Sequence, residues 1–534
     1  MLTAFLRRYT ARAYRQWEQS LQHPQKAQQR TLHQVLILQA RLPHQTSVRH
    51  NSFQAELACL RQLPLQTYED LPELSCLTHQ APLFYELTSG SSGAKKRIPY
   101  TRPLLSSFTQ MFLCWAHDIL VTLQQQGRPF AGGQVYFSVS PQFHDSLDEA
   151  DRGLTDDSDY LTGLTARLFE RFRAAPSSLR YLQNPEHFWD VLALALLRAP
   201  QLEVISVWSP SFLRVLQQHI QQHGRRLADL LAQPVLFYEN RPFKLPVPSP
   251  LRQRRLRETL QWLALQDPLS PTPVWVWAQC FPHLKLISAW GAENAARDFE
   301  ALRADFRFAF VQEKGLLATE APLTIPSVQQ GGFLPLPQAV FYEFIPLNRQ
   351  GQPLLTTQPL LLHELTPGEA YELVISQKSG LLRYRLKDRV RVTALRGSTP
   401  YLRFEGRSEA LCDLVGEKLN AMFVAQGVQH CYPRERVCVM PRLSPAGYVL
   451  VADQALEVAD LESYFLESPH YCNARKLGQL QALHLLVIPQ WPRFVQQFFV
   501  TQRHMKLGDI KDQVFYYREQ DGQLLQYLLA RACL

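Results

Sequence analysis

Hydrophobic residues recur every three to four positions over about the first 65 residues of the chain. The segments "TARAYRQWEQSLQ" and "QKAQQRTLHQVLILQARLP" both show this spacing, which predicts amphipathic helices. The segment "RPLLSSFTQMFLCWAHDILVTLQQQG" predicts a longer helix, with Thr101 as its cap and Pro103 in its first turn. We therefore expect a helical N-terminal part.

The pattern changes from Phe84 onward, where short apolar segments alternate with long helices. Strands are predicted in "GQVYFSVSP", "LEVISVW" and "LKLISAW", because each is a short run rich in β-branched and aromatic residues. Strands that alternate with helices predict a mixed α/β domain.

A third pattern begins near Gly332, with the closely spaced segments "AVFYEFIPL", "AYELVISQ", "GLLRYRLKDRVRVTAL" and "YLRFEG". These predict an antiparallel sheet or a small barrel. After "EGRSEA" we expect a helix over residues 416–425 and a strand pair in "RVCVMPRLSPAGYVLVAD". The domains are accordingly expected at residues 1–402 and 403–534.

The distribution of charge along the chain argues against nucleic acid as the partner. The formal net charge is +9, but the basic residues are scattered, whereas a dedicated nucleic-acid binder concentrates them on one face or arm. A nucleic-acid protein is therefore the weaker alternative, and it predicts steeply salt-dependent binding. We see no run of about 18 apolar residues that would predict a membrane span.

The nine cysteines show neither a CxxC pair nor a complete zinc-ligand spacing. They are expected to be reduced thiols in a cytoplasmic protein. The basic N-terminal segment lacks a secretory apolar region, so we expect the first helix of the fold there.

The segment "YELTSGSSGAKKRIPYT" raises the main chemical question. It does not fit a Walker loop, because only Ser91 and Ser92 separate Gly90 from Gly93. It predicts two strands, "LFYELTS" and "KRIPYT", joined by a turn of small hydroxyl residues. Such a turn is either a plain surface hairpin or a phosphate cradle of inward N–H groups and hydroxyls, with Lys96 neutralising phosphate charge.

This loop is similar to the phosphate-binding loop of the acyl-adenylate-forming superfamily, which includes acyl-CoA synthetases and luciferases. Within it, the chain more closely resembles the auxin-responsive promoter family of acyl acid amido synthetases, particularly its bacterial members. The motifs that carry the resemblance follow in the family's order: "LPLQTYEDLPEL", "VYFSVSP", "LKLISAWGAEN", "QEKGLLATEAPLTIP", "VFYEFIPL", "GLLRYRLKDRVRV", "FEGRSEALCDLVGEKLN" and "MKLGDIKDQ". They span some 430 residues.

The resemblance implies a large N-terminal adenylate-forming domain, with mixed sheets, helices and a small antiparallel barrel, and a small mobile C-terminal α+β domain. It also implies ATP and Mg²⁺ as cofactors. The expected reaction adenylates a carboxylic acid and transfers the acyl group to the amine of an amino acid. Two anions must meet in such a reaction, so cations and donors around the phosphates are needed more than a covalent nucleophile.

Individual roles follow from the matched motifs. Thr319 is expected to touch the α-phosphate and Glu320 to ligate Mg²⁺. The segment "YRLKD" is expected to end a strand at Asp388, whose carboxylate would accept both ribose hydroxyls. Arg407 matches the arginine that reaches the nucleotide, after the hinge glycine Gly406. The β- and γ-phosphates are expected to contact Thr88, Ser89, Gly90, Ser91, Ser92, Gly93 and Lys96, with Lys95 and Arg97 pointing away from Lys96.

Two positions depart from the family pattern. Leu316 replaces the usual tyrosine and offers no aromatic ring for adenine stacking, and Lys387 stands where the family has glycine before Asp388. Taken alone, Glu320 reads rather as a helix or loop-edge carboxylate and Asp388 as a surface ion-pair residue.

The late catalytic lysine is expected in "HMKLGDIKDQ", at Lys511 in preference to Lys506. Gly416, Glu417 and Lys418 match a family element expected at the start of a helix, with a solvated helix as the alternative. Trp290 is expected in the adenine or acyl pocket or in the core, and the acidic segment 144–159 is expected to be a solvated loop rather than a metal site.

Two other functions remain open from the sequence. An acyl-CoA synthetase would share the adenylation step and use coenzyme A as acceptor. A catalytically silent binding homologue is the alternative that Leu316 and Lys387 favour.

Overall fold

The computed structural model describes residues 2–38, 52–71, 77, 80–87, 96–137, 170–267, 271–292, 295–348, 352–407, 411–412, 414–415, 417, 419–476, 480–503, 505, 510, 512–517 and 521–532. These divide into two compact units. The first contains Met1–Gly291 with Asp298–Ser408, and the second contains Ala292–Arg297 with Glu409–Leu534.

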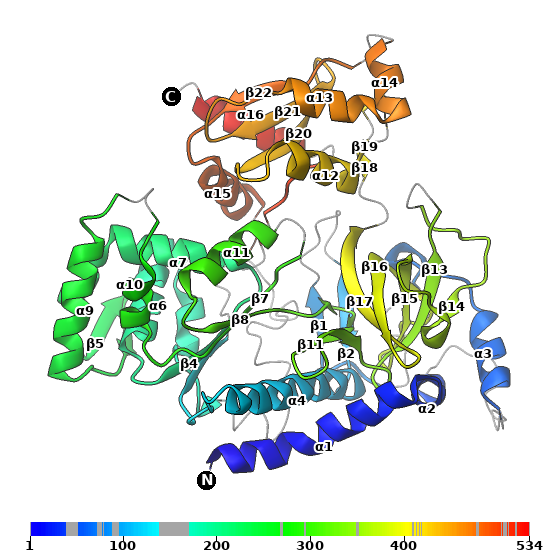
Figure 1. Ribbon diagram of the computed structural model, residues 1–534, viewed down its shortest axis with the longest axis horizontal. Helices are drawn as coiled ribbons and strands as arrows, with labels where there is room; N and C mark the ends of the chain where they lie inside the picture. Colours follow the sequence, from blue (N-terminus) through cyan, green and yellow to red (C-terminus); the bar gives the residue numbers. More distant parts are fainter. Residues whose placement is uncertain are drawn as a thin grey trace. The chain divides into compact units, whose positions relative to one another are not determined.

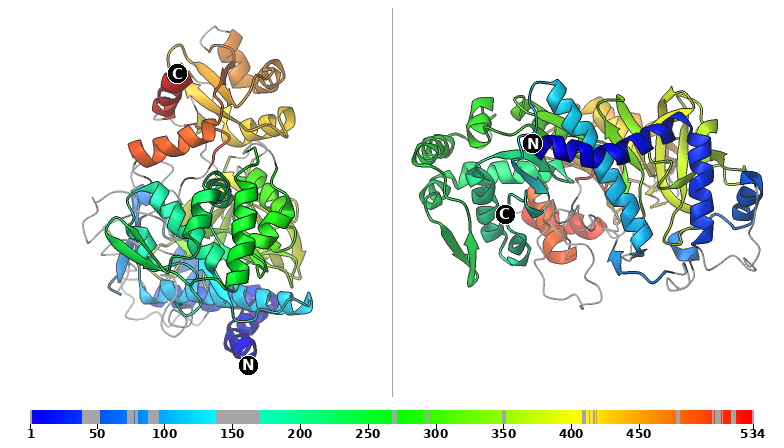
Figure 2. Two further views of the ribbon diagram at one scale, coloured as in Figure 1. Left: turned by 90° about the vertical axis from the view of Figure 1, so that its left-hand side faces the viewer. Right: turned by 90° about the horizontal axis from the view of Figure 1, so that it is seen from below.

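The first unit starts with the helices predicted from the apolar spacing: α1 (Leu2–Gln22), α2 (Pro24–Ile37) and α3 (Phe53–Arg61). Helix α4 (Arg102–Gln125) packs against α1, and Figure 2 shows the two helices crossing. Thr101 is the N-cap residue of α4, as predicted, but its hydroxyl makes no capping hydrogen bond and lies buried without a partner.

Within the described part of the chain, α4 alone is long and apolar enough to cross a membrane, and half of its most apolar window is buried. It carries a fully buried carboxylate, Asp118. That carboxylate accepts hydrogen bonds from the hydroxyl of Ser327 at 2.7 Å and the backbone N–H of Val328 at 2.7 Å. These contacts make α4 a core helix of this unit.

The predicted strands "GQVYFSVSP", "LEVISVW" and "LKLISAW" form β3 (Gln134–Phe137), β4 (Leu202–Ser206) and β7 (Leu286–Ala289). With β8 (Phe310–Glu313) they make a parallel sheet of order β3-β4-β7-β8. Its neighbours in the chain are the hairpin β5–β6 (Val235–Tyr238, Arg241–Lys244) and the helices α6 (Pro185–Arg198), α7 (Pro210–Gln222), α8 (Gly224–Leu230), α9 (Pro250–Leu263), α10 (Val274–Cys280) and α11 (Ala296–Asp305).

The antiparallel sheet is likewise confirmed (Figure 1). Its order is β14 (Leu360–Leu361), β13 (Phe341–Pro346), β15 (Ala370–Ser376), β16 (Tyr384–Arg396) and β17 (Thr399–Arg407). Three hairpins accompany it: β1–β2 (Phe84–Leu87, Arg97–Tyr100), β9–β10 (Leu317–Ala318, Ala321–Pro322) and β11–β12 (Thr324–Ser327, Gly332–Pro335). A hydrophobic cluster joins residues of α1, α4, β2 and this sheet, and the mixed α/β class expected from the sequence is confirmed.

The second unit contains the predicted strand pair, β20 (Val437–Arg442) and β21 (Gly447–Ala452), with β22 (His484–Val487) parallel to β21. Its other elements are β18 (Leu411–Cys412), β19 (Leu419–Asn420), α12 (Ala421–Cys431), α13 (Ala459–Leu466), α14 (Pro469–Lys476), α15 (Trp491–Arg503) and α16 (Gly522–Ala532).

The start predicted for the helix over residues 416–425 is wrong, because α12 begins at Ala421. Asn420 ends β19 and caps α12, because its side-chain oxygen accepts the N–H of Met422 at 2.8 Å. The alternative of a solvated helix is wrong at Glu417, since this side chain is fully buried. Its carboxylate accepts N–H groups of Leu414 at 2.9 Å and Val415 at 2.8 Å, so Glu417 orders the chain segment ahead of α12.

Candidate functional site

The glycine-rich turn is flanked by the two strands predicted for it. β1 and β2 pair antiparallel, with Leu87 opposite Arg97. The turn residues Thr88 to Gly93 and Lys95 lie outside the described residues. Lys96 is the first described residue after the turn, so the site is described from Lys96 onward.

Lys96 is held between two tyrosines. Its Nζ lies 3.5 Å from the hydroxyl of Tyr384 and 5.7 Å from the ring centroid of Tyr68, within the range of a cation–π contact. The backbone N–H of Arg97 donates to the Tyr68 hydroxyl at 2.9 Å. The Arg97 guanidinium instead stacks on Tyr85, so the two cations diverge as alternation along a strand predicts.

Thr319 and Glu320 form the two-residue turn of the β9–β10 hairpin. Tyr100, which is fully buried in β2, donates its hydroxyl hydrogen to the carbonyl oxygen of Thr319 at 2.6 Å. This bond ties the turn to the strand that follows Lys96.

Glu320 is not an exposed loop-edge residue, since only 8 % of it is accessible. Its Oε1 accepts the hydroxyl of Tyr384 at 3.3 Å. Burial raises the pKa of Glu320 above its usual range, and nearby Asp388 adds to this rise, whereas Lys96 and Arg407 oppose it. A carboxylate in this setting is stabilised by added positive charge.

Asp388 lies in the middle of β16 and not at its end, which corrects the expectation from the sequence. Lys387 adopts a left-handed backbone conformation with φ of 63°, and the pairing of β16 with β17 shifts register between Asp388 and Val390. A lysine therefore occupies a conformation that favours glycine. The redirected strand brings Asp388 Oδ1 to 3.0 Å from Nε of Arg407.

These contacts connect residues that are far apart in the sequence. Lys96 contacts Tyr384, Tyr384 contacts Glu320, and the charges of Asp388 and Arg407 act on Glu320. All of them belong to the first unit. Lys96 and Glu320 are thus joined through one buried tyrosine, and the Asp388–Arg407 pair lies close enough for its charges to act on Glu320.

The remaining predicted residues fall elsewhere. Leu316 is buried in the hydrophobic cluster behind the hairpin, so its side chain packs in the core. Trp290 packs edge-on against Phe404, with ring centroids 5.4 Å apart. The late lysines, Lys506 and Lys511, lie outside the described residues, as do Gly416, Lys418 and the acidic segment 144–159.

The donors available to a metal ion are few. Among the described residues, no group of three or more His, Cys, Asp or Glu side chains is placed to hold one. A single buried carboxylate such as Glu320 suits Mg²⁺, because this ion commonly takes one or two protein carboxylates and completes its shell with water and substrate phosphate oxygens.

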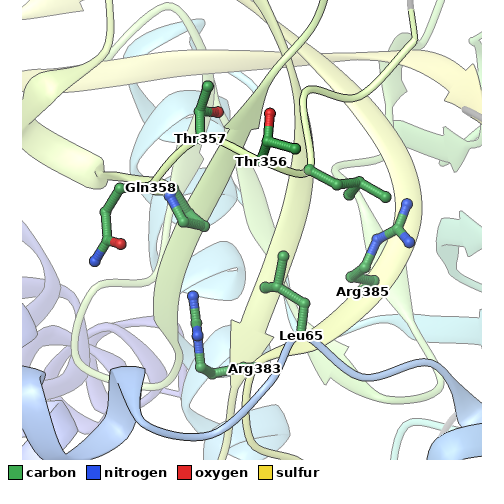
Figure 3. A pocket seen from close by; sticks show the side chains of 8 residues that line it. Leu65, Thr356, Thr357, Gln358, Arg383 and Arg385 are labelled. Atoms are coloured by element: carbon green, nitrogen blue, oxygen red, sulfur yellow. The ribbon is translucent and has the colours of Figure 1, made fainter.

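A surface pocket of about 390 Å³ also lies in this unit, lined by Leu65, Leu355, Thr356, Thr357, Gln358, Pro359, Arg383 and Arg385 (Figure 3). Its arginines are engaged by buried carboxylates. Arg383 donates to Glu343 at 3.1 Å, and Arg385 donates to Glu372 at 2.7 Å. The pocket is therefore built from internal ion pairs and lacks the site residues described above.

Sequence reasoning missed the tyrosines that organise the site. Tyr384 lies inside "GLLRYRLKD" and Tyr68 inside "LPLQTYEDLPEL", and both motifs carry the resemblance without a role for either tyrosine. The available signal was a polar aromatic side chain at a position predicted to be buried, because a buried hydroxyl usually has a hydrogen-bond partner.

Comparisons with known proteins show which proteins this chain is similar to. A structure described as AtGH3.15 acyl acid amido synthetase in complex with 2,4-DB is similar in fold, with a TM-score of 0.78 at 15 % identity over 98 % of this chain and 96 % of that one. Jasmonoyl–L-amino acid synthetase GH3.5 of Oryza sativa subsp. japonica is 27 % identical over 205 residues, which are 33 % of this chain and 35 % of that protein.

The human GH3 domain-containing protein is 26 % identical over 230 residues, covering 42 % of this chain and 39 % of that protein. The matches thus span well under half of the length of these curated relatives. The model of the GH3 family N-terminal domain matches residues 13–307, and that of the GH3 family central domain matches residues 333–407. The resemblance inferred from the motifs is thereby confirmed, and the chain belongs to the GH3 family.

Proposed function

We propose that this protein is an ATP- and Mg²⁺-dependent ligase that adenylates a carboxylic acid and transfers the acyl group to the amine of an amino acid. The observation that supports this most directly is the joining of Lys96 to Glu320 through Tyr384, next to the Asp388–Arg407 pair. Names of relatives such as jasmonoyl–L-amino acid synthetase support the amide product.

In the first step, a carboxylate oxygen attacks the α-phosphorus of ATP and pyrophosphate leaves. Lys96 is proposed to bind the β- and γ-phosphates together with Thr88, Ser89, Gly90, Ser91, Ser92 and Gly93. Thr319 is proposed to contact the α-phosphate, Asp388 the ribose hydroxyls and Arg407 the nucleotide. Positioned cations and donors of this kind offset the charge that develops between two anions.

Mg²⁺ would be held by Glu320 and would supply positive charge to the phosphates when bound. The fit rests on the chemistry of the site: Glu320 is a buried carboxylate whose ionised form is stabilised by a cation. Tyr384 holds this carboxylate in place through its 3.3 Å hydrogen bond.

In the second step, the amine nitrogen attacks the acyl carbon, AMP leaves, and the proton lost by the amine passes to solvent or to a base. Lys511 is proposed as the catalytic lysine. We assign ATP and acid binding to residues 1–402 and a lid role to residues 403–534. The cysteines within the described ranges are free thiols, which supports a cytoplasmic location.

The test is pyrophosphate exchange into ATP with a panel of aromatic, fatty and cyclic acids, followed by acceptor-dependent AMP release with each amino acid and with coenzyme A. We expect exchange to require Mg²⁺, to stop on chelation and to be lost in Lys96→Met. Amide product with an amino acid supports the proposal. A thioester with coenzyme A, and no amide with any amino acid, would instead identify an acyl-CoA synthetase.

A further inference from the structure

Tyr384 occupies a position between two groups of opposite charge. Its hydroxyl lies 3.5 Å from the ammonium nitrogen of Lys96 and 3.3 Å from Oε1 of Glu320. A lysine ammonium can only donate and an ionised carboxylate can only accept. The phenol oxygen must therefore accept from Lys96 while its hydrogen is donated to Glu320, and the two charged groups meet through this hydroxyl.

The backbone around Tyr384 is fixed from both sides. The N–H of Gln66 donates to the carbonyl of Arg383 at 3.0 Å, and the N–H of Arg385 donates to the carbonyl of Gln66 at 2.8 Å. On the neighbouring strand, Ile375 pairs with Tyr384. Tyr384 is 1 % accessible, so its ring has little freedom to leave the space between the two charges.

We propose that Tyr384 is a positioning residue that keeps the Lys96 ammonium and the Glu320 carboxylate apart, at the separation that triphosphate and cation need. This inference rests on the proposed function. An ammonium and a carboxylate in a buried site attract each other strongly. Without the hydroxyl between them, they would close into a direct ion pair, and this pair would have to be broken before either group binds its ligand.

The test uses the full chain and measures ATP binding by calorimetry, with Mg²⁺ and with chelator, in the unaltered protein and in Tyr384→Phe. We expect the dissociation constant for ATP with Mg²⁺ to rise about tenfold in Tyr384→Phe. The Mg²⁺ concentration that gives half-maximal pyrophosphate exchange should rise by about the same factor. The turnover number at saturation should change much less, because the ion pair is already broken in the bound state.

The decisive comparison makes Tyr384→Phe in the Glu320→Gln variant. This variant has no negative charge at residue 320 with which Lys96 could form an ion pair. There Tyr384→Phe should leave ATP binding, measured in chelator, nearly unchanged. Tyr342→Phe is the matched control, because Tyr342 is also buried in this sheet and its hydroxyl makes two backbone hydrogen bonds, at 2.7 and 3.1 Å. It should lower stability without weakening ATP binding.

The outcomes separate the two proposals. Absence of ATP binding by the unaltered protein overturns the proposed function and this inference with it. Exchange activity that Tyr384→Phe leaves unaltered overturns the role of Tyr384 alone and leaves the proposed function standing. The same conclusion follows if Tyr384→Phe weakens ATP binding equally in the unaltered protein and in the Glu320→Gln variant.

Discussion

Arg407 donates from Nε to Oδ1 of Asp388 at 3.0 Å, and the two residues face each other across β17 and β16. Asp388 is buried, whereas nearly half of the Arg407 side chain is accessible. The arginine therefore orients the carboxylate from its solvent side, at the position we assign to the ribose.

Asp388→Asn is expected to raise the dissociation constant for ATP by about 10- to 100-fold, because hydrogen bonds to a charged group each contribute roughly 1.5–3 kcal/mol. Calorimetry of ATP binding measures this directly. The matched control is Glu405→Gln, which breaks the neighbouring Arg391–Glu405 pair on the same two strands. An equal loss of affinity in both variants would show that strand stability, and not contact with the nucleotide, is responsible.

Lys387→Gly is expected to stabilise the protein. Lys387 has φ of 63°, a conformation that costs a residue with a side chain about 1–2 kcal/mol and that glycine adopts without strain. Part of this gain is offset by the greater freedom of glycine in the unfolded chain, which leaves a rise of about 1 kcal/mol in the free energy of unfolding, measured by denaturant titration.

Lys387→Ala serves as the control for the charge, because it removes the ammonium and keeps the strained backbone. If Lys387→Ala stabilises the protein as much as Lys387→Gly does, the cost at this position comes from the ammonium and not from the backbone conformation.

Much of the fold follows from local patterns in the sequence. The strands β3, β4 and β7 are short apolar runs between helices. Their residue types favour extended structure whatever their tertiary surroundings. Such elements are predictable because each is specified by its own residues. The start of α12 was missed because Asn420 competes with the longer helical pattern by capping, a choice that depends on one side chain.

The site was predictable only through motif order. Glu320 and Asp388 taken alone read as surface carboxylates, and their burial results from tertiary packing that no local pattern contains. Leu316 is a departure from the family's tyrosine in the sequence, but in the structure its side chain belongs to the core. Lys387 departs from the family's glycine, yet it adopts the left-handed conformation that glycine favours.

Glu313 is expected to make stability fall as pH rises above its unfolded pKa of about 4.3. Burial at the end of β8 raises its pKa in the folded protein, although Arg403 and Arg303 oppose the shift. Between the unfolded and folded pKa values, the folded state therefore binds more protons, and the stability contributed by this group is lost as pH increases through the folded pKa.

Glu313→Gln removes this titration. Denaturant titrations of both proteins from pH 4 to pH 7 should show the variant gaining stability relative to the unaltered protein as pH rises. A difference in unfolding free energy that is constant across this range would mean that Glu313 titrates alike in both states.

Tyr100→Phe tests whether the Thr319–Glu320 turn must be held against β2. The Tyr100 hydroxyl donates to the Thr319 carbonyl at 2.6 Å, and its ring stacks between Phe84 and Phe108, so phenylalanine should keep the packing and lose only the hydrogen bond. We expect the free energy of unfolding to fall by about 1 kcal/mol.

We also expect the Mg²⁺ concentration for half-maximal pyrophosphate exchange to rise several-fold in Tyr100→Phe, because Glu320 directly follows the released carbonyl. Tyr371→Phe provides the comparison, since its hydroxyl accepts the N–H of Thr366 at 3.1 Å away from the turn. If both variants lose stability but neither changes the Mg²⁺ requirement, the turn is positioned by the β9–β10 hairpin itself, and the bond from Tyr100 contributes only to folding.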